Sequence, residues 1–230
     1  MSAPTSRSAL KILILEDHVL FAESLELVLT IEGYNVARVE VPTNDQSAGS
    51  LLTAVLRKQP RIVLLDLDLG PFGDGARLIA PLAAAGINVV VITASADRSR
   101  WGGAVRSGAR KVHMKCRPLN EILATVRRIN QSLPVMDLEE RTELLTLWQE
   151  RRSEVHALQQ RIERLTVRER QVLGQLMRGH TVREIATASV VSEATVRTQV
   201  KSILAKLEVS SQLAAVGLAH HVGWRYAQSA

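Results

Sequence analysis

The stretch RIVLLDLDLGPFGDG (residues 61–75) decides the fold. Its apolar run ends at Asp66, and glycine and proline follow within a few residues, which is typical of a buried strand that ends in a turn. Four similar runs occur elsewhere: KILIL (11–15), NVARVEV (35–41), INVVVIT (87–93) and KVHM (111–114). Because these runs are continuously apolar rather than alternating, they predict strands that are covered on both faces.

Helix-like stretches separate these runs, at residues 19–31, 46–57, 74–85, 98–107 and 118–129. Five strands that alternate with five helices predict an α/β, doubly wound, five-stranded parallel sheet over residues 1–133. Ligands bind such sheets at the carboxyl ends of the strands. The residues that end each run are therefore the first candidates for a functional site.

Charged and hydroxyl side chains end four of the five runs. They are Glu16 and Asp17 after the first, Asp66 at the third, Thr93 at the fourth and Lys115 after the fifth. Carboxylates are hard oxygen ligands that can share a magnesium ion, and Asp66, near the middle of the sheet, is the candidate nucleophile. Lys115 can pair with an acyl phosphate, and Thr93 can donate a hydrogen bond to it. The set predicts a site that accepts a phosphoryl group.

The order of these residues resembles the receiver domain of two-component response regulators over about residues 9–131. GARKVHMK (108–115) also fits that family's approach to its fifth strand. The resemblance implies a flavodoxin-like fold, and it implies that a sensor histidine kinase phosphorylates Asp66. It assigns the remaining roles as follows: Mg²⁺ binding to Glu16, Asp17 and Asp66, and the switch and phosphate binding to Thr93 and Lys115.

Two features depart from the usual receiver pattern. Val112 stands three residues before the lysine, where an aromatic residue is usual, and the loop LDLGPFGDG (67–75) is one residue longer before its proline. Val112 leaves open a receiver that works without phosphorylation, as a dimerisation or ligand-sensing module. A third possibility is an aspartyl-nucleophile phosphatase, because Asp66-Leu-Asp68 resembles the nucleophile motif of the haloacid-dehalogenase type. That family, however, normally has threonine or valine where Gly70 stands.

Residues 134–164 are predicted to form a helical linker. From Asp137 to Arg164 there is no glycine or proline, and strong helix formers predominate. The apolar residues form an imperfect heptad pattern: Leu138, Leu145, Trp148, Val155 and Ile162. The pattern leaves open a helix that lies on one of its own domains and a coiled coil that joins two copies. We expect a homodimer in the active state.

Residues 165–230 predict an all-α, four-helix helix-turn-helix domain. Two capping boxes, Thr166-Val-Arg-Glu169 and Thr181-Val-Arg-Glu184, open the first two helices. Ser192 caps a third helix, and a fourth begins near Ser210. This segment holds eight basic and four acidic residues, a balance that suits binding to a polyanion.

The segment 165–219 resembles the LuxR-type DNA-binding domain through LTVRERQVL, REIA and SEATVRTQVKSILAKL. The resemblance places the recognition helix at Glu193 to Leu207. The candidate DNA contacts on that helix are Arg197, Thr198, Lys201 and Gln199, the last of these where many relatives have histidine. Together with the receiver, this predicts a response regulator of the NarL/LuxR class, which controls transcription and is not an enzyme.

The composition supports a globular protein. The chain has 230 residues, of which 46% are hydrophobic and 23% charged, with a formal net charge of +6. The single cysteine, Cys116, can form neither an internal disulfide nor a zinc site alone. No apolar run approaches the roughly 20 residues of a membrane span, and the first residues do not resemble a secretory signal. We therefore expect a cytoplasmic protein with no membrane partner.

Overall fold

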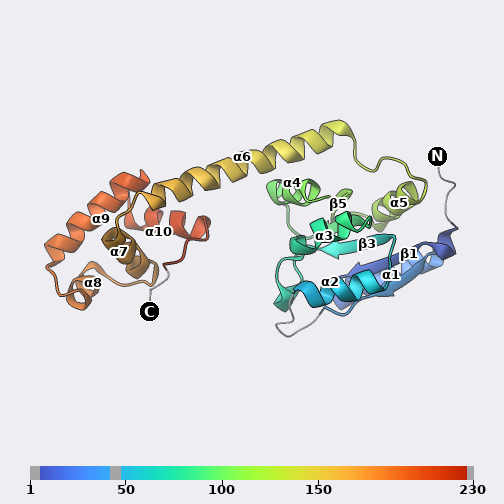
Figure 1. Ribbon diagram of the computed structural model, residues 1–230, viewed down its shortest axis with the longest axis horizontal. Helices are drawn as coiled ribbons and strands as arrows, with labels where there is room; N and C mark the ends of the chain where they lie inside the picture. The colour runs from blue at the N-terminus through green and yellow to red at the C-terminus, as the bar shows by residue number, and fades with distance from the viewer. Residues whose placement is uncertain (1–5, 42–47, 227–230) are drawn as a thin grey trace. The chain divides into compact units, whose positions relative to one another are not determined.

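The computed structural model describes residues 6–41 and 48–226 (Figure 1). The chain divides into two compact units, Met1–Gln149 and Glu150–Ala230. Unit 1 has helices packed on a sheet, and unit 2 is helical. Gln46 and Ser47, which were predicted to begin a helix, lie outside the described residues.

The sheet of unit 1 has five parallel strands, which confirms the predicted fold. They are β1 (Lys11–Leu15), β2 (Asn35–Arg38), β3 (Ile62–Asp66), β4 (Asn88–Thr93) and β5 (Lys111–Met114). Their order is β2-β1-β3-β4-β5, so β3 is the central strand. The strand predicted for residues 35–41 is shorter and ends at Arg38, which makes the last pair with β1, to Ile14.

Helices cover both faces of this sheet (Figure 1). They are α1 (Val19–Ile31), α2 (Ala48–Arg57), α3 (Ile79–Ala84), α4 (Arg98–Arg106) and α5 (Leu119–Asn130), with short 3-10 turns η1 (Arg7–Ala9), η2 (Gly70–Phe72) and η3 (Gly75–Leu78). Successive strand residues point to opposite faces, so each strand feeds two apolar cores. Val63 packs in the core beneath α2, α3 and α4, whereas Leu64 packs beneath α1 and α5. The helix predicted for residues 74–85 starts as η3, where Asp74 caps the turn.

A long helix, α6 (Leu138–Glu163), contains the boundary between the two units. Leu144 on its first half is 1% exposed and belongs to the α2–α4 core of unit 1. Ile162 near its end belongs to the core of unit 2. The first half of α6 thus lies on its own receiver-like unit, one of the two arrangements that the heptad pattern left open.

Unit 2 consists of the end of α6 and four helices: α7 (Val167–Met177), α8 (Val182–Ala188), α9 (Glu193–Leu207) and α10 (Gln212–His221). Both predicted capping boxes form, and Ser192 and Ser211 cap α9 and α10. The apolar face of α9 packs against α7 and α8. Among the described helices none alone is long and apolar enough to cross a membrane, although α9 and α10 together, bent by 53°, pass that test of length and composition.

Candidate functional site

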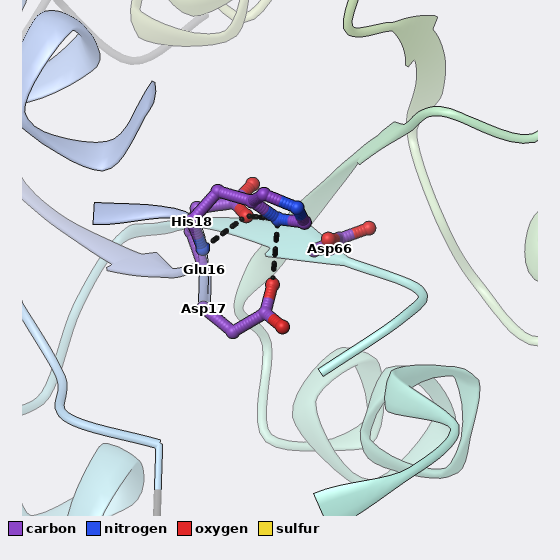
Figure 2. A group of neighbouring side chains, drawn as sticks. All are labelled: Glu16, Asp17, His18 and Asp66. Carbon is purple, nitrogen blue, oxygen red and sulfur yellow. Dashed lines mark hydrogen bonds and ion pairs between the residues drawn. The ribbon is translucent and has the colours of Figure 1, made fainter. Parts of the chain in front are cut away.

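Three acidic side chains meet at the carboxyl edge of the sheet (Figure 2). Glu16 and Asp17 directly follow β1, and Asp66 ends the neighbouring strand β3. One oxygen from each of them, and one ring nitrogen of His18, lie within 4.8 Å of one another. The sequence prediction that these carboxylates converge is therefore confirmed.

Lys115 lies against the same carboxylates. Its Nζ donates to Asp66 Oδ2 at 2.6 Å and to Glu16 Oε1 at 2.7 Å. The side chains of Asp66 and Glu16 are only 1% and 2% exposed. Burial raises the pKa of Glu16, and repulsion from Asp66 adds to the rise, against the opposing hydrogen bond from Lys115. Burial alone would lower the pKa of Lys115, but its hydrogen bonds to Asp66 and Glu16 outweigh burial and raise it.

His18 closes the exposed side of this cluster. Its Nδ1 lies 2.9 Å from Asp17 Oδ1 and 3.1 Å from Glu16 Oε1, and its backbone N–H donates to Glu16 Oε1 at 2.9 Å (Figure 2). Three carboxylates face one ammonium group here, so negative charge is in excess unless a cation joins them. Hard carboxylate oxygens in such a set suit a divalent ion of the magnesium type.

Thr93 lies at the same edge of the sheet. It follows Ile92, which pairs with Asp66, and its backbone oxygen accepts from Lys115 N at 2.8 Å. The side chain is fully buried, and Oγ1 accepts from Ser95 N at 3.1 Å. Because that bond uses the oxygen only as an acceptor, the hydroxyl proton remains available for donation.

Arg100 on α4 is a residue of this region that the sequence did not reveal. Its guanidinium donates to both carboxylate oxygens of Asp68, at 3.0 and 2.9 Å, and also to Asp74 Oδ1 and Leu67 O, each at 3.1 Å. The hydrogen bond from Arg100 holds the pKa of Asp68 below its usual value. The Asp68 side chain is 59% exposed, so its carboxylate faces water and also forms this two-pronged ion pair with Arg100.

In unit 2, α9 presents polar residues to solvent. Arg197, Thr198 and Lys201 are exposed, and Arg197 pairs with Glu193 one turn earlier at 3.2 Å. Gln199 is half-buried, and its Oε1 has no hydrogen-bond partner in the part of the chain that the structure describes. An exposed helix with basic side chains one turn apart has the geometry of a major-groove reader.

The inward side of α9 is fixed by a buried carboxylate. Glu169 on α7 accepts from Lys206 Nζ at 2.7 Å, from Ser202 Oγ at 2.6 Å and from Thr166 N at 2.7 Å. Burial alone would raise its pKa, but the hydrogen bonds from Lys206 and Ser202 lower it to about 2. The capping box predicted Glu169 as a helix cap, whereas its bond to Lys206 had no signal in the sequence pattern.

Two family models match the chain. The model described as "Response regulator receiver domain" matches residues 12–127, and the model described as "Bacterial regulatory proteins, luxR family" matches residues 163–219. The first match includes Asp66-Leu-Asp68, so it favours the receiver over the phosphatase resemblance of that stretch. It covers half of the chain.

Similar proteins agree with these matches over nearly the whole length. The chain is 27% identical to the uncharacterized transcriptional regulatory protein YhcZ of Bacillus subtilis, over 88% of this chain and 92% of that protein. It is 24% identical to the transcriptional regulatory protein DesR of Bacillus subtilis, over 94% and 98%. A structure of the RcsB response regulator of Salmonella typhimurium aligns with a TM-score of 0.51 at 18% identity, over 92% of this chain and 99% of that one, which shows likeness of fold. The chain belongs to the response regulator family, with a receiver domain followed by a DNA-binding domain of the luxR family.

Proposed function

We propose that this response regulator is phosphorylated on Asp66 by a sensor histidine kinase in the cytoplasm and controls transcription through α9. One observation carries the proposal: the buried Asp66 carboxylate lies 2.6 Å from Lys115 Nζ, beside Glu16 and Asp17. In the transfer, Asp66 forms an O–P bond as the N–P bond of a phosphohistidine breaks, and the freed imidazole takes up a proton.

Each neighbouring residue has a task in this proposal. Lys115 pairs with the negative charge of the acyl phosphate, and the Thr93 hydroxyl donates to a phosphoryl oxygen. Glu16, Asp17 and Asp66 are the residues that would hold Mg²⁺, because three carboxylates face a single ammonium group at this edge. The bound ion would offset the carboxylate charge and screen the incoming phosphoryl group.

The test of this proposal is labelling with a small phosphodonor. Wild-type protein incubated with acetyl phosphate and Mg²⁺ should gain the mass of one phosphoryl group, and Asp66→Asn should gain none. Asp137→Asn, an exposed carboxylate that caps α6, is the matched control and should label like wild type. Labelling that persisted in Asp66→Asn would overturn the assignment. A wild type that took no label would instead support a receiver that works without phosphorylation.

For DNA we propose that Arg197, Thr198 and Lys201 contact the double helix, with Gln199 beside them, and that the active protein binds as a homodimer. Two-fold binding predicts paired half-sites about one helical turn apart. Arg197→Ala and Lys201→Ala should each weaken binding and reduce the slope of log affinity against log salt by about 1. Arg161→Ala, a basic residue of α6 paired with Glu208, should leave the slope unchanged. Equal slopes in all four proteins would remove α9 from the interface.

A further inference from the structure

A continuous set of contacts leads from the acceptor residue to α4. The backbone N–H of Asp68 donates to Asp66 Oδ1 at 3.1 Å, and the Asp68 carboxylate is held by both prongs of Arg100. Arg100 also binds Asp74 and the carbonyl of Leu67, so one guanidinium holds both ends of the loop that follows Asp66. Hydrogen bonds and an ion pair therefore join Asp66 Oδ1, through Asp68, to a side chain of α4.

Two glycines of α4 that follow Arg100, Gly102 and Gly103, lie against α6. A Cβ built on Gly102 would overlap the carbonyl oxygen of Leu144 and would lie 2.8 Å from the Cβ of Trp148. A Cβ on Gly103 would lie 3.2 Å from the indole of the same tryptophan. The two glycines thus allow the α6 backbone to approach α4 closely, and a displacement of α4 would press directly on α6 because packed interiors transmit strain.

Two ion pairs also join α6 to the rest of unit 1 beside these glycines. Arg98 of α4 pairs with Glu143 at 2.8 Å, and Lys111 of β5 donates to Glu140 at 2.7 Å. Val112 lies buried in the same core as Leu144 and carries no ring that could change rotamer as a signal. The contacts through Arg100 offer this receiver a route that needs no aromatic residue.

We propose that Arg100 is a positioning residue that holds the loop after Asp66. Through α4 and the contact of Gly102 with α6, it couples the state of Asp66 to residues 138–149 of α6. This inference rests on the proposed phosphorylation. A phosphoryl group bonded to Asp66 alters the carboxylate that accepts from Asp68 N, so the loop and Arg100 must adjust together. Because the α6 backbone is in direct contact with α4, its hydrogen exchange should change when the loop and Arg100 move.

Hydrogen exchange in the full-length protein tests the coupling. Exchange of residues 138–149 is compared with and without beryllofluoride plus Mg²⁺, which mimic the phosphoryl group. Coupling between sites corresponds to roughly 5-fold or larger changes, so the wild-type rate should change by at least about 5-fold. Arg100→Gln should reduce this change to under about 2-fold while Asp66 still labels with acetyl phosphate. Arg100→Lys, which keeps the charge and loses the fork, should restore part of the response.

The matched control is Arg98→Gln, on the same helix. It removes a contact to α6 without touching the loop after Asp66, so it should speed exchange in both states and preserve their ratio. Asp68→Asn, whose side chain is 59% exposed, repeats the test from the other partner of the ion pair and decides the matter if Arg100→Gln does not fold.

Three results separate the possible failures. A full wild-type response in folded Arg100→Gln and Asp68→Asn would overturn the coupling. Labelling of wild-type Asp66 without any change in α6 would overturn it too, and would leave the proposed function intact. No labelling of Asp66 at all would overturn the proposed function, and with it this inference.

Discussion

Each unit of the molecule buries a carboxylate, and the two are treated in opposite ways. Glu169 in unit 2 accepts hydrogen bonds from a lysine, a serine and a backbone amide, and its pKa falls to about 2. Asp66 in unit 1 shares one lysine with Glu16 and lies beside Asp17, and the pKa of Glu16 rises. Both carboxylates are almost fully inaccessible to water.

The difference separates a carboxylate whose hydrogen bonds hold helices together from the carboxylate to which we assign phosphorylation. A buried charge is tolerated when its hydrogen bonds are complete, and it then fixes the helices that supply the partners. The site in unit 1 has three carboxylates beside one lysine, so a bound cation would offset its surplus negative charge. Burial alone does not distinguish the two sites, whereas the balance of donors against acceptors does.

The largest expected effect comes from removing the partner of the satisfied carboxylate. Lys206→Met should destabilise unit 2 by about 3 to 5 kcal/mol, because it leaves Glu169 buried without a counter-charge. Urea unfolding measures this through the fluorescence of Trp224, in a protein in which Trp101 and Trp148 of unit 1 are replaced by phenylalanine so that Trp224 alone emits. If the free energy of unfolding fell by less than about 1 kcal/mol, this ion pair would contribute no more to stability than an exposed surface pair.

Acid should affect the two sites in opposite directions. The pKa of Glu169 is lowered in the folded state, so its stabilisation is present above its ordinary pKa of 4.5 and is lost as pH falls toward about 2. The loss is roughly 3 kcal/mol in unit 2. The pKa of Glu16 is raised, so its contribution is favourable below 4.5 and is lost as pH rises. Acid titrations of Glu169→Gln and Glu16→Gln should each remove the corresponding trend, and a trend that remained would have another source.

The smallest of these effects concerns the lysine of the unsatisfied site. The measured effect is the part of the loss that Mg²⁺ recovers: Lys115→Met leaves Asp66 and Glu16 buried without their lysine, which should cost about 3 to 5 kcal/mol, and Mg²⁺ should recover part of that loss. Mg²⁺ should recover nothing in Lys206→Met. Thermal unfolding with and without the ion measures both variants. If Mg²⁺ stabilised both equally, the contrast between the two sites would fail.

The sequence predicted that Asp66 and Lys115 meet because parallel strands end at a common edge. Asp66 and Lys115 are 49 positions apart, yet each follows an apolar run, and the alternation of strands and helices brings the ends of the runs together. Strand lengths were less predictable. The run that predicted a strand over residues 35–41 continues past Arg38, where β2 makes its last pair with β1.

The alternation of strands and helices did not predict contacts that long side chains make from helix surfaces. Arg100 lies inside α4 and reaches the loop after β3, and no spacing rule relates it to Asp68. The predicted capping box found Glu169, but Lys206 is 37 positions further along, on a helix whose packing angle sets the distance. Such pairs depend on tertiary geometry, so they emerge only once the helices are placed.

Helix α6 has one fully buried apolar side chain in each core, Leu144 in unit 1 and Ile162 in unit 2, and its other residues are half-buried or exposed. Isolated helices of this polar kind are marginal in water, so α6 owes its order to those two cores. Melting either core would fray one end of the same helix and weaken the support of the other. Fragments cut at the boundary after Gln149 should therefore each melt at a lower temperature than the same unit within the intact chain.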